Sequence, residues 1–390
     1  MEQLSIPDYD KSKDTVAAAR ARARLNGYVA TGKEEGAKLF NLIKQNVITP
    51  YLIYTKDMDF DPALRAGETP LYKARVDSGL QDFRLHKHAL SQMAAEVGIP
   101  AVFVTMLTKG EDWERGELAA LLEERFRKLD FKQRGGGQPR FINLVVANEV
   151  RGFVSRSFKR YLRSGPIFEA FVRSCASFGA MPVEALTSDL AFTLRCVLPY
   201  TFELDDKNHI AVGVSCSNSD FGAGTFRLSL TVMNLQTGVI TVVRHVKEER
   251  HVGSAERDGG DSEILSDATI ERKIVATQSE IKDVVLEALH PNKINKLLDL
   301  IRRSMDKEIP WTKFVSYMRG ALTSEEIKEL GELLKDQAKS RAIADIKYNV
   351  DNEAVLNLWW ASNAVATIAN KYEGEKKDAL QFAAGSLLDV

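Results

Sequence analysis

The chain has 390 residues, of which 44% are hydrophobic, so it holds enough apolar material for two or three domains with their own cores. Its net charge is −1, which excludes a polycation, so any attraction to nucleic acid must come from a local basic patch. Three cysteines without a CxxC pair argue against a disulfide framework and a structural zinc site, and they favour the reducing cytoplasm.

The first 130 residues predict a mainly helical region. The opening MEQLSIPDYDKSKDT is acidic and polar and predicts no signal peptide, and no run of about 18 apolar residues predicts a membrane span. Good helix formers over residues 12–46 predict two helices, because Gly27 and Gly32 interrupt the pattern. Further helices are predicted in LHKHALSQMAAEVG, which ends at Gly98, and in GELAALLEERFRKLDF.

Residues 131–255 predict an antiparallel sheet core. The stretch RFINLVVANEVRGFVS predicts two short strands joined at Ala147–Asn148–Glu149, which is a β-hairpin. GPIFEAFVRSCASFG then predicts a helix with Pro166 in its first turn. Several strand-like runs follow, and the alternation in TFRLSLTV indicates a sheet with one wet face.

Residues 262–390 predict a helical C-terminal region, after a polar linker at HVGSAERDGGDSE. Thr323 and Glu326 have the spacing of a capping box, which marks the start of one helix. The order of these regions predicts an α+β fold. We expect a central antiparallel sheet with a basic hairpin, flanked by N-terminal (1–130) and C-terminal helical regions.

The most unusual feature is a basic segment between Arg125 and Arg163, which contains eleven lysines and arginines but only two acidic residues. Since the whole chain is nearly neutral, the remainder is acidic, and the protein has one basic face. Within the segment, Arg156, Lys159, Arg160 and Arg163 would align on one side of a helix and repel each other. An external polyanion would relieve this repulsion, with release of its counterions.

We therefore expect this segment to bind nucleic acid, with single-stranded DNA favoured, because its aromatic residues would stack on bases while its cations hold the backbone. The candidate residues are Arg134, Arg140, Arg151, Phe153, Arg156, Phe158, Lys159, Arg160, Tyr161 and Arg163. The alternative is a solvated cationic surface whose aromatic residues belong to the core. The glycine-rich KQRGGGQPR favours a flexible hairpin connector over a phosphate nest, and no Walker motif follows it.

A second candidate site is KDMDFDP, where Asp57, Asp59 and Asp61 would share one face of a strand. Clustered carboxylates bind Mg²⁺ in phosphoryl transfer, which keeps a metal-dependent nuclease or nucleotide-processing enzyme open as an alternative. No partner Glu or His follows at a recognisable spacing, so a solvated loop is the favoured interpretation. Because no zinc, GxSxG or Cys–His pattern occurs, we expect no cofactor and favour a protein without enzymatic activity.

Four stretches between residues 80 and 390 carry a family resemblance. They are DFRLHKHALSQMAAEVGIP, RGFVSRSFKRYLRSGPIFEAF, VGVSCSNSDFGAGTFRLSLTVMN and NLWWASNAVATIANKYEGEKKDALQFAAGSLL. In this order they resemble an uncharacterised family of phage and plasmid proteins with a domain of unknown function. The resemblance implies a mobile-element origin and a bacterial cytoplasm, and it supplies no active site. Where the family has Cys-Thr-Asn-Gly this chain has MNLQTG, which leaves that thiol without a role.

Together these features predict a phage-encoded protein that binds or anneals single-stranded DNA in replication or recombination. Annealing requires a groove that holds a strand by its backbone, and it needs neither a nucleophile nor a metal. Contact of the basic face with the acidic remainder of another copy would give a homo-oligomer. Besides the metal-dependent enzyme, the other alternative is a protein that binds a host factor through its acidic C-terminal helices, for host takeover or anti-defence.

Overall fold

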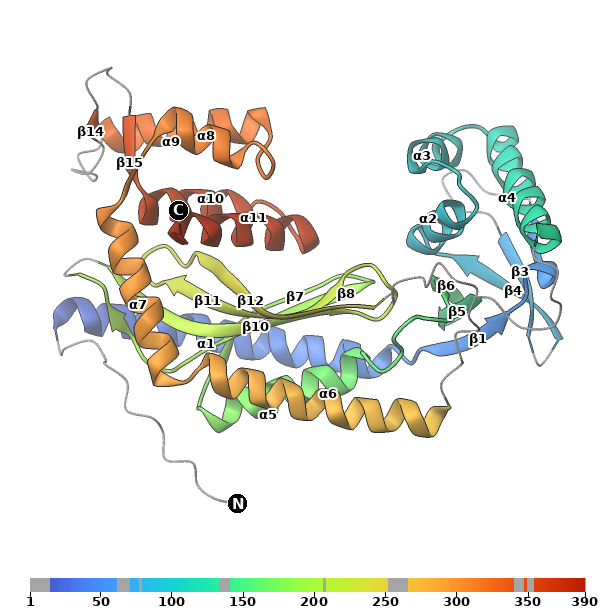
Figure 1. Cartoon of the computed structure of the whole chain (residues 1–390), viewed down its shortest axis with the longest axis horizontal. Coiled ribbons are helices and arrows are strands. Elements are labelled where there is room, and N and C mark those ends of the chain that lie inside the picture. Colours follow the sequence, from blue (N-terminus) through green and yellow to red (C-terminus); the bar gives the residue numbers. More distant parts are fainter. Residues whose placement is uncertain are drawn as a thin grey trace.

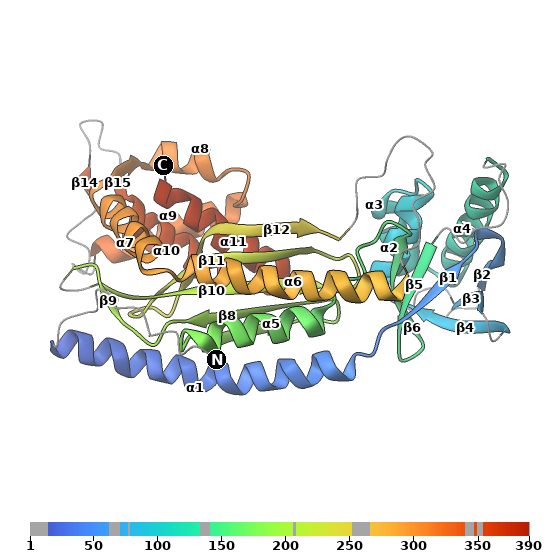
Figure 2. The same cartoon turned by 60° about the horizontal axis from the view of Figure 1, so that its bottom comes forward.

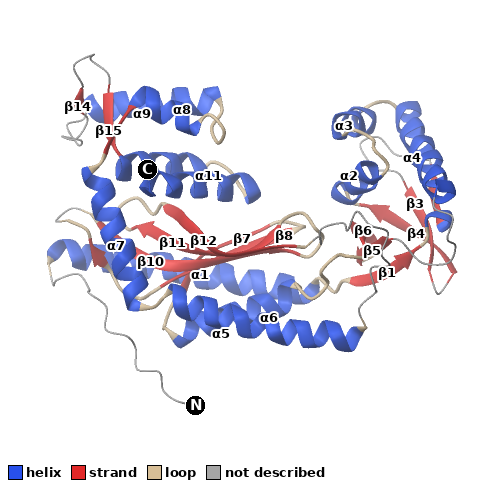
Figure 3. Cartoon of the chain, viewed as in Figure 1, coloured by secondary structure: helices blue, strands red, loops and turns tan. Residues whose placement is uncertain are grey.

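The computed structural model has an α+β fold, which confirms the predicted fold class (Figure 1). Antiparallel strands form the centre, and helices from both ends of the chain surround them (Figure 3). The structure describes residues 15–61, 71–76, 79–132, 141–205, 208–251, 266–339, 347–348 and 354–389. Within these ranges, no helix is long and apolar enough to cross a membrane.

The main sheet has the strand order β12-β11-β10-β8-β7, and every pair in it is antiparallel. Its strands are β7 (Met181–Thr187), β8 (Ala191–Val197), β10 (His209–Ser219), β11 (Thr225–Asn234), β12 (Ile240–Arg250) and the short β9 (Phe202–Glu203), which pairs with β10. The prediction that one face of β11 is exposed to solvent is wrong, because the strand is buried on both faces from Leu228 onward. Because helices cover both faces of this sheet, buried and exposed side chains do not alternate along the strand.

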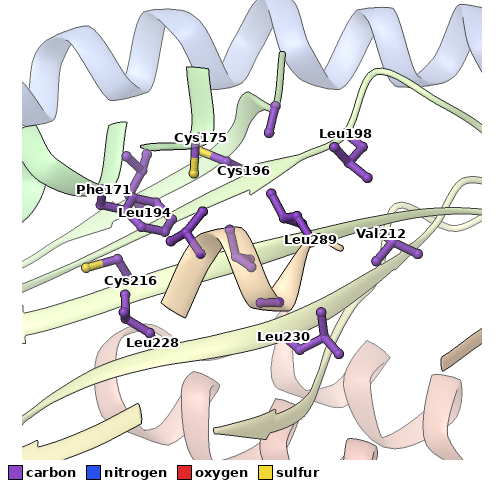
Figure 4. Close-up of a cluster of buried hydrophobic side chains, with 14 of the residues drawn as sticks. Phe171, Cys175, Leu194, Cys196, Leu198, Val212, Cys216, Leu228, Leu230 and Leu289 are labelled. Carbon is purple, nitrogen blue, oxygen red and sulfur yellow. The ribbon is translucent and has the colours of Figure 1, made fainter. Parts of the chain in front are cut away.

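Helices α5 (Ser164–Ser177) and α6 (Asp267–Ala288) pack on one face of the main sheet, and α1 (Val16–Gln45) runs along its edge strand β7 (Figure 2). The largest hydrophobic core lies between them and the strands. In it, Phe171 and Cys175 of α5 meet Leu194 and Cys196 of β8 (Figure 4). All three cysteines are buried free thiols, in line with the prediction that they form no disulfide framework.

Helix α1 is continuous across Gly27 and Gly32, so the predicted break into two helices is wrong. At Gly32 an added Cβ would lie only 2.4 Å from the Val183 Cα of β7. Glycine is therefore required where the helix touches the backbone of the edge strand. Its cost to the helix, about 1 kcal/mol, is offset by this close packing.

The opposite face of the main sheet carries α10 (Leu358–Ala369) and α11 (Gly374–Ser386). Arg195 of β8 is 1% exposed and forms ion pairs with Glu184 of β7 and Asp378 of α11. Lys377 of α11 also binds Glu184, with 2.6 Å between Nζ and Oε1. This ionic network fixes the position of α11 on the sheet, because the buried Arg195 joins a carboxylate of β7 to one of α11 and is costly to leave without these partners.

A second sheet forms a separate N-terminal lobe, with the order β1-β5-β6-β4-β3-β2 (Figure 1). Its strands are β1 (Thr49–Ile53), β2 (Met58–Asp61), β3 (Leu71–Val76), β4 (Gly79–Leu85), β5 (Phe141–Val146) and β6 (Glu149–Ser155), and its helices are η1 (Thr55–Asp57), α2 (Lys87–Glu96), α3 (Ala101–Lys109) and α4 (Asp112–Lys132). The predicted hairpin is confirmed as β5–β6, with Ala147 and Asn148 at φ of 47° and 65° in its two-residue turn. It pairs with strands from before residue 131 and not with the main sheet.

The C-terminal region is mainly helical, as predicted. Besides α10 and α11 it contains α7 (Pro291–Asp306), β13 (Glu308–Pro310), α8 (Trp311–Met318), α9 (Ser324–Lys339), β14 (Lys347–Tyr348), β15 (Ala354–Asn357) and η2 (Leu387–Asp389). The capping box at the start of α9 is confirmed. The Thr323 N–H donates to Glu326 Oε2 at 2.6 Å, and the Glu326 N–H donates to Thr323 Oγ1 at 3.3 Å.

Candidate nucleic-acid interface

The chain between β6 and α5, here called the basic turn (Arg156–Arg163), is not helical. The predicted alignment of four cations along one helix side is therefore wrong. Backbone groups of the turn bond to distant parts of the chain instead. The Lys159 N–H donates to the His251 carbonyl at 2.7 Å, just after the end of β12. Phe158 and Leu162 point inward and are buried, which also opposes a regular helix on the surface.

Asn218 of β10 holds the far side of the basic turn through a buried hydrogen-bond network. Its Nδ2 donates to the Leu162 carbonyl at 3.0 Å and to Ser164 Oγ at 3.1 Å. Its Oδ1 lies 2.9 Å from Nε2 of His251 and accepts a hydrogen bond from that ring. Asn218 and His251 are both 2% exposed, so water does not compete for these bonds. The turn is thus fixed from inside the protein.

Asp220 caps the start of α5 from a neighbouring loop. Its Oδ1 accepts a hydrogen bond of 2.7 Å from the Ser164 N–H, where the positive end of the helix dipole favours an anion. Burial raises the pKa of this carboxyl group. The next residue, Phe221, accepts hydrogen bonds at its carbonyl from His88 and Gln92 of α2. The loop after β10 therefore joins the basic turn, α5 and the N-terminal lobe.

Two of the aromatic residues expected to stack on bases lie in the protein interior. Phe153 is 4% exposed and stacks on Phe141, with ring centroids 4.5 Å apart, inside the core of the N-terminal lobe. Phe158 is 7% exposed and stacks on the His251 ring at 5.4 Å. The expectation that these two rings form an exposed platform is wrong, because each faces a core. Phe158 instead holds the basic turn against His251, and Phe153 belongs to the core of the lobe.

Tyr161 is half-buried and shares one carboxylate with a neighbouring cation. Its hydroxyl donates to Glu249 Oε1 at 2.7 Å, and Lys159 Nζ lies 2.9 Å from the same oxygen. Burial and the contact with Glu249 raise the pKa of Tyr161. Burial alone would raise the pKa of Glu249, but the hydrogen bonds from Lys159 and Tyr161 lower it. Lys273 of α6 lies over the Tyr161 ring at 5.1 Å and adds a further cation beside the turn.

The predicted cations divide into paired and unpaired side chains. Arg151 lies on β6, where its Nε is 2.9 Å from Glu149 Oε2, and Lys159 is neutralised by Glu249. In the part of the chain that the structure describes, no carboxylate lies within 4 Å of the Arg156 or Arg163 side chain. Arg156 is half-buried and Arg163 is exposed.

Arg160 lies between these two arginines on the turn and is half-buried. Burial lowers its pKa, the nearby charge of Arg163 lowers it further, and Asp267 raises it. Arg160 and Arg163 are therefore close enough to repel each other. Arg134 and Arg140, the remaining predicted cations, lie outside the described residues.

The three aspartates proposed as a metal site face cations of the same lobe. Asp61 Oδ2 lies 3.3 Å from Lys73 Nζ, and Asp57 Oδ1 lies 3.7 Å from Arg75 Nε. Asp59 is directly opposite Lys73 in the β2–β3 pairing. The described residues contain no group of three His, Cys, Asp or Glu side chains that could hold a metal ion. The carboxylates thus balance the charge of β3.

Sequence reasoning missed the polar side chains that position the basic turn, namely Asn218, Asp220, Glu249 and His251. The Asn-Ser-Asp stretch was visible as a motif, but its role depends on contacts with residues more than 50 positions away. Comparison of the chain with protein-family models, with curated proteins and with solved structures gave no match. A function for this interface must therefore be argued from its own geometry.

Proposed function

We propose that this protein binds single-stranded nucleic acid, with single-stranded DNA as the favoured ligand, at the basic turn. One observation supports the proposal. The basic turn is a surface segment rich in positive charge, and buried hydrogen bonds beneath it hold it in place. Asn218 and His251 hold the turn in one conformation, although Arg160 and Arg163 repel each other and no carboxylate among the described residues lies within 4 Å of the Arg156 or Arg163 side chain. A loop fixed by a rigid scaffold is typical of a binding site.

In this proposal, Arg156 and Arg163 bind phosphates of the strand, together with Arg160 and with Lys273 from α6. Guanidinium groups suit phosphate because they donate in a planar fork. Tyr161 is the one ring of the turn with enough exposure to touch a base. Backbone contacts of this kind are independent of base sequence and leave base edges free, as strand annealing requires. We place this activity in phage DNA replication or recombination, within the cytoplasm of a bacterial host.

The direct test is fluorescence anisotropy with a labelled oligo(dT) and with a duplex of equal length. We expect the wild-type protein to bind the single strand more tightly than the duplex. The double variant Arg156→Gln/Arg163→Gln should weaken binding at least tenfold, because two charge-assisted contacts of about 1.5 kcal/mol each are lost. The control Arg127→Gln/Lys128→Gln removes the same charge from exposed positions of α4 and should leave the affinity nearly unchanged. Equal losses in both variants would show that only total charge matters.

A second candidate function, self-association, is favoured by apolar side chains on the N-terminal lobe. Val102 and Met106 of α3 are 82% and 53% exposed, and Trp113 at the start of α4 is 61% exposed. Exposed large apolar side chains of this kind are typical of protein interfaces. Sedimentation velocity should show a concentration-dependent increase in size for the wild type that Val102→Ser/Met106→Ser abolishes. A monomer at all concentrations would argue against this function.

A further inference from the structure

A hollow of about 280 Å³, lined by both polar and apolar residues, opens on the face of the main sheet that carries α11. Its floor is a row of directly paired residues on four neighbouring strands, Leu186, Thr193, Ser217 and Arg227. Side chains of paired residues on antiparallel strands lie on the same face. The Thr193 hydroxyl donates to Asp378 Oδ2 of α11 at 3.0 Å, which fixes this face as the one below α11.

The hollow exists because α11 begins too late to cover the end of the sheet. Glu373, Gly374 and Asp378, at the start of the helix, form its wall. The central floor residues Thr193 and Ser217 are short, so they leave the space above them open. On the opposite face of the same strands, large apolar side chains form the largest hydrophobic core. A row of residues that served only close packing would leave no such open space, so these residues differ from an ordinary packed row.

The hollow and the basic turn lie at the same end of the main sheet but on its two faces, because Ser217 and Asn218 are consecutive residues of β10 and point to opposite sides. Asn218 lines the hollow, and its side chain also holds the Leu162 carbonyl of the turn. Arg151 donates to the Asp189 carbonyl in the loop between β7 and β8, at 3.3 Å. Thr187 and Ser188 of that loop form the rim. A strand held by the basic turn would reach the opening around this end of the sheet.

The chemistry of the lining selects for a base and against a phosphate. The acids Glu373 and Asp378 stand beside one cation, Arg227, which is already paired with Glu248 at 3.2 Å. Both oxygens of Asp378 are engaged, by Thr193 and by Arg195. Glu373 is exposed and makes no capping bond to α11, so its carboxylate can accept a new donor. Carboxylates accept hydrogen bonds from exocyclic amino groups such as cytosine N4.

We infer that this hollow binds a nucleobase bearing an exocyclic amino group, with cytosine preferred over thymine. The inference rests on the proposed function, since the basic turn would hold the strand whose base enters the hollow. The volume is several times that of a water molecule, about 30 Å³, and lies just below the range of drug-sized pockets, about 300–1,000 Å³. It therefore suits a single base, while the sugar and phosphate stay outside.

The test compares oligo(dC) with oligo(dT), which have the same backbone charge and a pyrimidine of similar size. We expect the wild type to bind oligo(dC) about tenfold more tightly, the value of one hydrogen bond to a charged acceptor. Ser217→Leu fills the hollow and Glu373→Gln removes the acceptor charge, so both should lower oligo(dC) affinity to that of oligo(dT). Ser91→Leu on the exposed face of α2 is the matched control and should keep the preference.

The outcomes separate this inference from the proposal on which it rests. Equal wild-type affinity for the two oligonucleotides overturns the base site but leaves strand binding at the basic turn intact. A preference that persists in both Ser217→Leu and Glu373→Gln overturns it as well. No binding of either oligonucleotide refutes both proposals. Glu373 is exposed, so its variant tests the site even if Ser217→Leu lowers the stability of the fold.

Discussion

Acidification should destabilise the fold through His251, which is buried beneath the basic turn. Its Nε2 donates to Asn218 Oδ1, and its Nδ1 is buried without a hydrogen-bond partner among the described residues. A proton added at Nδ1 would therefore become an unsatisfied buried donor, and burial lowers the pKa of His251 to about 4. An unfolded histidine has a pKa of about 6.5. Between these values the unfolded state binds more protons, so stability falls as pH falls.

The size of this effect follows from the two pKa values. At pH 5 the unfolded ring is almost fully protonated and the folded ring is mostly neutral, which costs about 2 kcal/mol of unfolding free energy relative to pH 7.5. Urea unfolding at both pH values should show this loss in the wild type. His251→Gln should be less stable at pH 7.5, since the ring stacking on Phe158 is lost, but its stability should fall by about 2 kcal/mol less on acidification.

A control variant distinguishes this site from histidines in general. His290→Gln replaces an exposed histidine at the start of α7, and it should keep the acid dependence of the wild type. If His251→Gln and the wild type lost equal stability between pH 7.5 and pH 5, the buried neutral ring would not be the cause. The support assigned to the basic turn would then need another origin.

Four further substitutions test the packing that positions the site, each by urea unfolding at neutral pH. Gly32→Ala places a methyl group against the β7 backbone and should cost about 1–3 kcal/mol, whereas Gly27→Ala, which meets open space, should stabilise α1 by about 0.5–1 kcal/mol. Asp220→Ala removes the cap of α5 and should cost about 0.5–2 kcal/mol. Arg195→Ala removes the buried cation shared by Glu184 and Asp378 and should cost about 3–5 kcal/mol. Equal stability of the two glycine variants, or a neutral effect at Asp220 or Arg195, would contradict the packing described.

The sequence correctly predicted those elements that are determined by residues close together along the chain. The β5–β6 hairpin followed from the two-residue turn at Ala147 and Asn148, and the start of α9 followed from the Thr323–Glu326 capping box. The α+β class followed from the order of helical and strand-like segments. In each case the residues that decide the structure lie within a few positions of each other, so spacing alone carried the information.

The predictions from the sequence were wrong where contacts between residues distant along the chain determine the structure. Gly32 looked like a helix breaker because its contact with Val183 lies on another element. The cations of the basic turn had helical spacing, but the Lys159 N–H bonds to His251 and not to a residue one helical turn away. Phe153 looked exposed beside arginines, yet the pleat of β6 turns it into the lobe core. None of these partners is visible from neighbouring positions along the chain.

The salt dependence of oligo(dT) binding tests the central claim most directly. Each phosphate contact on a single strand contributes about 0.7 to the slope of log affinity against log salt concentration. The account predicts that Arg156→Gln/Arg163→Gln lowers the magnitude of that slope by about 1.4, while Arg127→Gln/Lys128→Gln on α4 leaves it unchanged. A wild-type slope near zero, or the same slope in wild type and both double variants, would contradict phosphate binding at the basic turn.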